Sequence, residues 1–216
     1  MTTQQLAKTI DHTLLKPAKN SQIETLCQEA IQHGFASVCV NPQHIKLAAK
    51  LLEGSDVEVC TVVGFPLGEN TTATKVFETK NAIKLGATEI DMVISQSWAK
   101  SNSWKKVEKE VSAVVKAAKG LTVKVILETC NLTPKQIENA CIACVNAGAT
   151  FVKTSTGFGT GGATLHDVAL MAQTVKPHGL QVKASGGVRT HDDAIAMIQA
   201  GADRIGTSGG VTICKG

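Results

Sequence analysis

The sequence predicts an α/β fold, a closed (β/α)8 TIM barrel with a short N-terminal helix, from three observations. Hydrophobic residues make up 43% of the 216 residues but aromatic residues only 3%. The core must therefore consist of Val, Ile, Leu and Ala, which suits buried parallel strands. Helical and strand patterns alternate along the chain in about eight units. This number and this chain length favour a closed barrel over the alternative, a doubly wound open sheet.

The third observation is a short connection that recurs three times, at Leu85-Gly86-Ala87-Thr88, Ala147-Gly148-Ala149-Thr150 and Ala200-Gly201-Ala202-Asp203. Each glycine falls where an expected helix ends and a strand follows. A left-handed backbone at that position costs glycine little. The connection marks the seam of a repeated helix–strand unit. Because no linker or low-complexity segment interrupts the repeat, we expect one barrel domain over residues 1–216.

The expected elements follow in order. Short apolar runs that end at glycine, proline or polar residues predict strands at 10–15, 37–40, 57–63, 89–94, 123–128, 151–157, 180–187 and 203–208. Helical spacing predicts helices at 3–9, 21–33, 44–52, 72–85, 104–119, from 134, 165–175 and 192–200. Ser21 with Glu24 has the pattern of a capping box, Pro134 suits a first helical position, and Thr190 suits an N-cap. The polar stretch 95–103 is expected to connect a strand to the next helix.

Composition argues against several function classes. The net charge of +4 is small and dispersed, which does not favour nucleic-acid or membrane partners. No stretch has the length of a membrane span, and the N-terminus has no signal-peptide pattern. Most of the seven cysteines lie in apolar runs and are expected to be small buried hydrophobes in a reducing compartment. Cys141 and Cys144 lack a second pair that could complete a zinc site. We therefore expect a cytoplasmic protein.

Two lysines lie inside expected strands, Lys153 and Lys183. Lysine is rarely buried unless it is paired, and catalytic residues of such barrels lie at the C-terminal ends of the strands. If both lysines point inward from neighbouring strands, burial and mutual repulsion disfavour the protonated form of one amine. A neutral amine is what a nucleophilic lysine requires. The alternative is that both lysines extend to the barrel rim.

Asp91 is the third candidate catalytic residue, because strand alternation places it on one face with Glu89 and Val93. A carboxylate there can hold a protonated lysine or relay protons through water. The alternative is a purely structural ion pair.

Glycine-rich segments after the last two strands predict a phosphate site. Gly186-Gly187 and 206–210 match the position at which barrels commonly bind phosphate, with backbone N–H groups facing the anion. Tight turns are the alternative for each segment. The segment 157–162 fits G-x-G-x-x-G, but no acidic residue follows at the distance that dinucleotide binding requires. It is expected to be a mobile loop over the site.

The six histidines do not cluster and offer weak support for a metal site. His12 is a candidate for facing the cavity. The others, expected at the surface or at helix caps, are His33, His44, His166, His178 and His191.

Several segments resemble the deoxyribose-phosphate aldolase family, in its shorter bacterial form, over essentially the whole chain. The segments that carry the resemblance are 10–17 (IDHTLLKP), 37–42 (SVCVNP), 63–68 (VGFPLG), 151–158 (FVKTSTGF) and 182–189 (VKASGGVR). The resemblance implies a class I aldolase that reversibly cleaves 2-deoxy-D-ribose 5-phosphate to D-glyceraldehyde 3-phosphate and acetaldehyde, and that needs no metal and no organic cofactor. It also implies a homodimer or homotetramer.

The resemblance also implies residue roles. Lys153 would form the Schiff base, Lys183 would perturb it and share in proton transfer, and Asp91 would relay protons. Thr156 would lie near a substrate hydroxyl, and the residues around the phosphate would be Gly157, Gly186, Gly187, Gly206 and Ser208. Two features depart from the family pattern: the chain has no tyrosine for the C-terminal closing element, and Gly209 stands where relatives often have a second serine.

Three rival functions remain at this stage: a non-catalytic phosphosugar-binding barrel, a metal-dependent aldolase and a phosphosugar isomerase. Cys39, in a strand near the expected site, is a candidate target of acetaldehyde.

Overall fold

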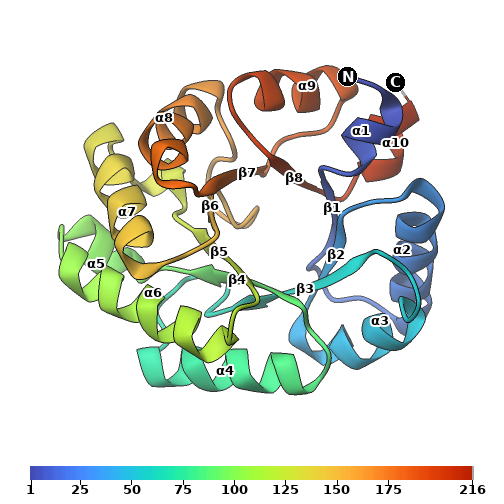
Figure 1. The fold of residues 1–216 in the computed structure, drawn as a ribbon, viewed down its shortest axis with the longest axis horizontal. Helices are drawn as coiled ribbons and strands as arrows, with labels where there is room; N and C mark the ends of the chain where they lie inside the picture. Colours follow the sequence, from blue (N-terminus) through green and yellow to red (C-terminus); the bar gives the residue numbers. More distant parts are fainter. Residues whose placement is uncertain (216) are drawn as a thin grey trace.

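The computed structural model describes residues 1–215 and shows eight parallel strands that close into a barrel (Figure 1). Each strand pairs with its neighbour in sequence, and β1 (Ile10–Leu14) also pairs with β8 (Arg204–Thr207). This closure confirms the barrel prediction and shows that the open-sheet alternative was wrong. The remaining strands are β2 (Ser37–Val40), β3 (Glu58–Val63), β4 (Glu89–Val93), β5 (Thr122–Ile126), β6 (Phe151–Lys153) and β7 (Gln181–Ser185).

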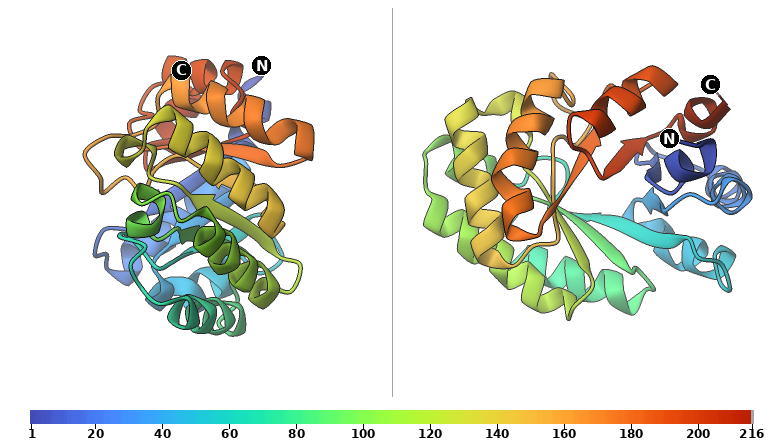
Figure 2. Two further views of the ribbon diagram at one scale, coloured as in Figure 1. Left: turned by 90° about the vertical axis from the view of Figure 1, so that its left-hand side faces the viewer. Right: turned by 45° about the horizontal axis from the view of Figure 1, so that its top comes forward.

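The helices form a ring outside the strands (Figures 1 and 2). They are α1 (Thr3–Ala7), α2 (Asn20–His33), α3 (Ile45–Leu51), α4 (Thr72–Lys84), α5 (Gln96–Lys100), α6 (Trp104–Ala118), α7 (Pro134–Ala147), α8 (Leu165–Val175), α9 (His191–Gln199) and α10 (Gly210–Lys215). Three 3-10 turns are η1 (Pro42–His44), η2 (Thr129–Asn131) and η3 (Lys176–His178). The first and last helices, α1 and α10, contact each other, which brings the two ends of the barrel chain together.

The expected capping box of α2 was wrong. The helix begins at Asn20 with Lys19 as its N-cap, and the Gln22 side chain accepts a hydrogen bond from the Lys19 N–H at 3.0 Å. Gln22, at the N3 position, thus provides the acceptor for the backbone N–H of the N-cap residue. Ser21 and Glu24 lie inside the helix. Two other helix starts were predicted correctly. Pro134 is the first residue of α7, after the N-cap Thr133, and Thr190 is the N-cap of α9.

Two short helices were not predicted. The polar stretch 95–103 contains α5, whose N-cap Ser95 accepts a hydrogen bond from the Trp98 N–H at 3.3 Å. The glycine-rich segment after β8 leads directly into α10. Both helices are shorter than the windows over which helical periodicity can be recognised.

The three recurring glycines have the left-handed conformation that the sequence predicted. Their φ angles are +107° at Gly86, +77° at Gly148 and +118° at Gly201. At Gly86 a Cβ atom would come within 2.8 Å of the Ala49 Cβ, and at Gly201 within 2.6 Å of the Ala172 Cβ. Glycine is therefore required at these two positions by the backbone conformation and by the close approach of a neighbouring helix, α3 at Gly86 and α8 at Gly201.

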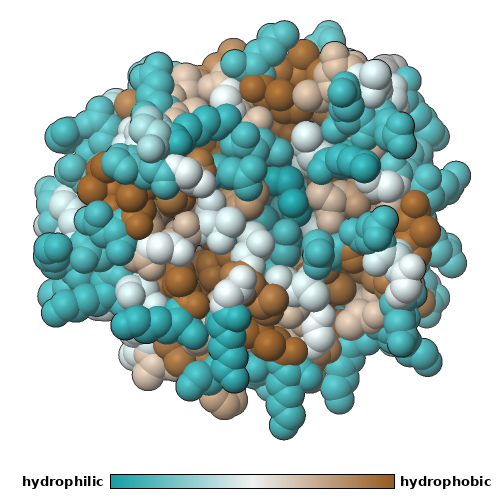
Figure 3. All heavy atoms as spheres, in the orientation of Figure 1, coloured by the Kyte–Doolittle hydropathy of each residue, from teal (hydrophilic) through white to brown (hydrophobic). Residues whose placement is uncertain are grey.

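The main apolar core lies between the strands and the helices, built mostly from Val, Ile, Leu and Ala. A second, small apolar cluster of Leu15, Cys39, Cys60 and Val62, packed against Phe65, is separate from it. On the face seen in Figure 1, exposed apolar residues form several separate groups among hydrophilic ones (Figure 3). None of the helices within residues 1–215 combines the length and apolar character that a membrane crossing needs.

A buried ion pair ties the loop after β3 to the barrel. Lys75 on α4 is fully buried, and its Nζ lies 2.8 Å from the Glu110 Oε1, 2.7 Å from the Gly68 carbonyl and 2.8 Å from the Val93 carbonyl. Burial lowers the pKa of Lys75 and raises that of Glu110, although each partner offsets part of the other's shift. The pair therefore fixes the loop geometry more than it adds net stability.

Replacing Lys75 with methionine should lower the free energy of unfolding by about 3–5 kcal/mol, because Glu110 would be left buried without its partner. Urea denaturation at neutral pH measures this loss. The matched control is Lys80→Met, at an exposed position of the same helix. The double variant Lys75→Met/Glu110→Gln should recover part of the loss. A single-variant loss no larger than that of the control would contradict this prediction.

Candidate active site

Lys153 and Lys183 are direct neighbours inside the barrel. Lys153 is the last residue of β6, Lys183 lies in the middle of β7, and the two are paired in register. Both donate hydrogen bonds to the Asp91 Oδ2, Lys153 at 2.7 Å and Lys183 at 2.8 Å. All three side chains are buried. The structure thus brings together the three residues that the sequence singled out as catalytic.

A deeper ionic layer surrounds this group. Lys124 on β5 is fully buried, and its Nζ lies 2.5 Å from the Glu89 Oε2 and 3.1 Å from the Asp91 Oδ1. Asp11 on β1 lies 2.5 Å from the Lys183 Nζ. The guanidinium of Arg204 on β8 pairs with Asp11 and, at 3.0 Å, with Glu89. Strand alternation aims all of these side chains into the barrel, where the charges compensate one another.

This layer fixes the charge on its members. Burial alone would raise the pKa of Asp91, but Lys124 and the hydrogen-bonded Lys153 outweigh it and hold that pKa well below its ordinary value. Burial alone would lower the pKa of Lys183, but Asp11 and Asp91 outweigh it and raise that pKa. Burial alone would also lower the pKa of Lys124, but Asp91 and the other acidic groups around it outweigh burial and raise that pKa. The residues next to Lys153 therefore form a permanently charged environment at neutral pH.

A cavity of about 520 Å³ opens over Lys153 at the C-terminal ends of the strands. Its lining includes every residue that the sequence assigned to substrate or phosphate: Thr156, Gly157, Gly186, Gly187, Gly206 and Ser208. Two basic residues that the sequence reasoning did not select, Lys16 and Arg189, line it as well. Lys153 is thus the point at which the buried ionic layer meets a space large enough for a small ligand.

Three glycines of this lining have left-handed backbones, with φ of +83° at Gly157, +83° at Gly186 and +84° at Gly187. At Gly206 a Cβ atom would come within 2.9 Å of the Lys183 Cε. Glycine at this position therefore leaves room for the Lys183 side chain. Loops of this kind can turn backbone N–H groups toward an anion, and the lining also carries the cations Lys16 and Arg189.

Glu128 supports the loop after β6. It follows β5, has the unusual φ of +57°, and its carboxylate accepts hydrogen bonds from the Thr156 N–H at 3.2 Å and from the Thr156 hydroxyl at 2.5 Å. A non-glycine residue in this conformation stores backbone strain, which often accompanies a functional constraint. Glu128 holds Thr156 at the cavity wall.

The G-x-G-x-x-G segment lies in the loop between β6 and α8. Its first glycine lines the cavity, whereas Gly162 packs so closely against the Gly186 carbonyl that a Cβ atom would lie 2.2 Å from its oxygen. Phe158 also lines the cavity, and its ring meets the Phe65 ring edge-on at 5.4 Å between centroids. The loop borders the site as expected; its mobility stays a prediction.

The expectation for one histidine was wrong. His12 does not face the cavity: its Nε2 lies 2.7 Å from the Glu29 carboxylate and its ring packs against Phe35. Strand alternation explains this, because Asp11 on the same strand points inward and His12 therefore points to the helices. His44 lies at the N-cap of α3, as expected, and is buried there, with its Nε2 3.1 Å from the Gln43 amide.

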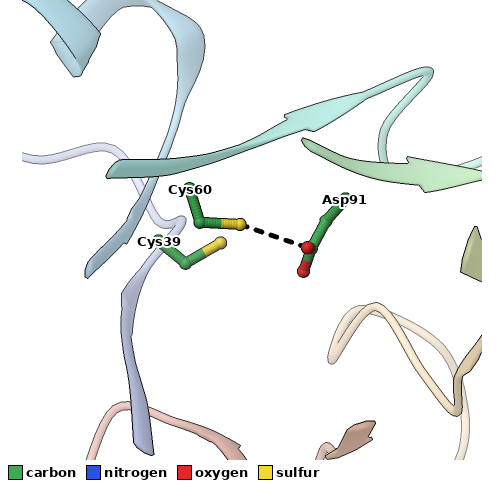
Figure 4. Close-up of side chains that lie close together, drawn as sticks. All are labelled: Cys39, Cys60 and Asp91. Carbon is green, nitrogen blue, oxygen red and sulfur yellow. Dashed lines mark hydrogen bonds between the residues drawn. The ribbon is translucent and has the colours of Figure 1, made fainter. Parts of the chain in front are cut away.

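One group of potential metal ligands lies in the barrel: Cys39, Cys60 and Asp91, whose ligand atoms are within 4.8 Å of one another (Figure 4). Asp91 already accepts hydrogen bonds from the side-chain nitrogens of Lys124, Lys153 and Lys183. A divalent cation at this place would meet the positive charges of Lys124 and Lys183, which makes the group a poor metal site.

The sequence reasoning did not select Lys124 and Arg204 as site residues. Lys124 shares the face of its strand with Thr122 and Ile126, and this alternation was a readable signal for a third inward lysine. Arg204 begins its strand, so its direction depends on the barrel register and could not be read from local pattern alone.

Comparisons with known proteins agree with this geometry. Residues 5–216 match the model of a family described as DeoC/LacD family aldolase. The chain is 57% identical over its full length to the deoxyribose-phosphate aldolase of Clostridium perfringens (strain SM101 / Type A), covering 97% of that protein. It is 60% identical, over 98% of its length and 95% of the relative, to the enzyme of that name from Geobacillus sp. (strain WCH70). The solved tetrameric deoxyribose phosphate aldolase of Aeropyrum pernix is 39% identical, covers 99% of this chain and 91% of its own, and superposes with a TM-score of 0.93.

Proposed function

The chain belongs to the DeoC/LacD family of aldolases, and we propose that it cleaves 2-deoxy-D-ribose 5-phosphate to D-glyceraldehyde 3-phosphate and acetaldehyde through a Schiff base on Lys153. The reaction is reversible. The full-length relatives at 57% and 60% identity support the substrate, since they are deoxyribose-phosphate aldolases. The residue assignment rests on the geometry around Lys153.

The observation that carries this assignment is the position of Lys153 between a cavity and a surplus of positive charge. The ionic layer contains four basic side chains and three carboxylates: Lys124, Lys153, Lys183 and Arg204 with Asp11, Glu89 and Asp91. If all were ionised, one positive charge would be unbalanced in a buried site, which is costly. Lys153 pairs with Asp91 alone, whereas Lys124 and Lys183 also pair with Asp11. A neutral Lys153 amine balances the layer and is the form that attacks a carbonyl.

The reaction then proceeds as follows. The Lys153 Nζ attacks the C1 aldehyde of the open-chain sugar phosphate, and loss of water gives an iminium ion that withdraws electrons from C2. Removal of the C3 hydroxyl proton breaks the C2–C3 bond, releases D-glyceraldehyde 3-phosphate and leaves an enamine on Lys153. Protonation at C2 and hydrolysis release acetaldehyde and restore the amine. No step requires a metal or an organic cofactor.

Asp91 and Lys183 serve the proton transfers. Asp91 is held ionised by its lysine neighbours, so it suits a role in which a proton passes through water without being stored on the carboxylate. Its negative charge also lies beside the Lys153 Nζ, 2.7 Å away, where the iminium charge forms. The charged Lys183 on the same carboxylate oxygen keeps Asp91 in place.

The phosphate occupies the glycine-rich end of the cavity. Gly157, Gly186, Gly187, Gly206 and Ser208 offer backbone N–H groups and a hydroxyl there, and Thr156 contacts a substrate hydroxyl. Lys16 and Arg189 add the positive charge that a phosphate dianion requires. Binding energy gained at the phosphate positions the reacting carbons at Lys153. Phe158, in the same lining, is apolar and covers the cavity without adding charge.

We propose a cytoplasmic enzyme, a single barrel domain over residues 1–216, with no nucleic-acid or membrane partner. We further propose that it is a homodimer or homotetramer. The relative from Aeropyrum pernix is tetrameric, and large apolar side chains such as Phe77 on α4 and Ile142 on α7 are exposed here. Such side chains on helix faces are suited to contacts between subunits.

Borohydride reduction in the presence of acetaldehyde tests the proposed chemistry. We expect the reduced imine to leave an ethyl group on Lys153, located by peptide mass mapping, together with irreversible loss of activity. A phosphosugar isomerase, a metal-dependent aldolase or a non-catalytic binding protein would give no such adduct. Modification confined to exposed lysines would overturn the assignment of Lys153.

A further inference from the structure

Two cysteines face each other inside the barrel, on the floor of the site. Cys39 on β2 and Cys60 on β3 are paired in register, and both side chains point toward Asp91 (Figure 4). Neighbouring parallel strands are about 4.8 Å apart, which falls within the Cα separations that a disulfide spans. Both thiols are free and fully buried.

Cys60 is part of the hydrogen-bonded environment of the proposed proton relay. Its thiol donates to the Asp91 Oδ1 at 3.1 Å, and its sulfur accepts a hydrogen bond from the Lys124 Nζ at 3.5 Å. Cys60 therefore supplies one of the four hydrogen bonds that Asp91 accepts, beside those from the three lysines. A change in the bonding of the Cys60 sulfur removes a donor from this carboxylate.

The two thiols also differ in acidity in the way that oxidisable pairs do. The neighbouring Cys60 thiol lowers the pKa of Cys39 against the opposing effect of burial. Burial and the neighbouring Cys39 thiol raise the pKa of Cys60. Cys39 is thus the thiol that ionises first, and Cys60 is the partner that can resolve an oxidised Cys39.

The cysteine pair packs in the same apolar cluster as a residue that lines the cavity. Cys39 and Cys60 belong to the apolar cluster with Leu15 and Phe65, and Leu15 also lines the cavity above Lys153. A small peroxide would reach the pair by displacing Leu15. Oxidation at this place should be slower than at the exposed Cys130, because the pair itself is buried.

We propose that Cys39 and Cys60 form a reversible disulfide when the protein meets a peroxide, and that this disulfide lowers aldolase activity through Asp91. The effect on activity rests on the proposed function; the disulfide itself does not. The Cys39 thiolate attacks one peroxide oxygen, the O–O bond breaks, and Cys39 becomes a sulfenic acid while one water leaves. The Cys60 sulfur attacks the Cys39 sulfur, the S–O bond breaks, and a second water leaves. Two thiols are oxidised and one peroxide is reduced, and a dithiol reductant reverses the change.

The disulfide turns the Cys60 sulfur toward Cys39 and removes the thiol proton that Asp91 accepts. Lys124 loses the same sulfur as a partner. Losing one hydrogen bond to a buried charged group should lower kcat by about tenfold or more, with a smaller change in KM. The fold itself should remain, since both residues stay in their strands.

The test combines mass spectrometry with kinetics on the whole protein. After treatment with hydrogen peroxide, we expect a peptide cross-linked between Cys39 and Cys60, a fall in kcat that follows the cross-linked fraction, and recovery of both with dithiothreitol. The Cys39→Ala variant should lose the cross-link and the reversible inactivation, each measured against its own untreated activity. The matched control Cys130→Ser, at the exposed cysteine, should oxidise and recover as the parent does.

Three results would overturn the proposal: inactivation with the two peptides still unlinked, a cross-link without any fall in kcat, or inactivation that dithiothreitol does not reverse. Failure of the proposed function would appear separately, as no turnover and no borohydride adduct in untreated protein.

Discussion

Replacing Lys153 with methionine should reduce the turnover of 2-deoxy-D-ribose 5-phosphate by roughly 10⁴-fold or more while leaving the barrel folded. Methionine has no amine to form the Schiff base, and loss of a covalent nucleophile has effects of this size in enzymes. The ionic layer would retain three basic residues, Lys124, Lys183 and Arg204, opposite its three carboxylates. We therefore expect the urea midpoint to change little, in contrast to Lys75→Met. A coupled assay of D-glyceraldehyde 3-phosphate measures the activity.

Two further variants make this experiment specific. Lys153→Arg keeps a positive charge but cannot form an imine, so it should be as inactive as the methionine variant. Lys135→Met changes an exposed lysine on α7 and should leave turnover unchanged. If the arginine variant retained substantial activity, the charge of Lys153 would matter and its nucleophilicity would not. That result would exclude the Schiff-base mechanism.

The fold and the pair of lysines could be predicted because the signals are local. Strand runs, helix caps and the glycine connections each depend on a few neighbouring residues. Lys153 and Lys183 stood out because lysine is unusual within such runs. The seam glycines such as Gly86 were readable for the same reason, since glycine marks a left-handed backbone.

The charge balance of the site could not be read in this way. It depends on how Asp11, Glu89 and Arg204, far apart in the sequence, are brought into contact by the register of the closed sheet. Adjacent strands predict that Lys183 repels Lys153, but only the structure places Asp91 within hydrogen-bond distance of both amines. The pairing of Cys39 with Cys60 likewise follows from the register of β2 with β3, and both side chains point toward Asp91. Two cysteines in separate apolar runs predict burial and nothing more.

Replacing Asp91 with asparagine should have the second-largest effect and should act on activity and stability together. The variant would leave four basic side chains opposite two carboxylates in a buried layer, so we expect the free energy of unfolding at neutral pH to fall by about 3–5 kcal/mol. Loss of the proton relay should lower kcat by about 10²- to 10⁴-fold. Asp56→Asn, at an exposed position before β3, is the matched control for both measurements.

The pH dependence of stability identifies the source of this loss. The pKa of Asp91 is lower in the folded protein than in the unfolded chain, so its contribution is present above the unfolded pKa, near 4, and is lost as the pH falls below that value. The stability difference between the parent and Asp91→Asn should therefore shrink on acidification. Urea denaturation at a series of pH values measures this difference. A difference that stays constant would assign the loss to packing instead of to charge.

Asp91→Asn also separates the nucleophile from the proton relay. Lys153 remains in this variant, and the neutral asparagine amide does not favour the protonated form of the Lys153 amine. We therefore expect borohydride and acetaldehyde still to ethylate Lys153, although cleavage of the sugar phosphate is slow. If the variant formed no adduct, Asp91 would be required for imine formation itself, and its role would extend beyond the cleavage step. If cleavage persisted at the parent rate, proton transfer would have to run through Lys183 or water alone.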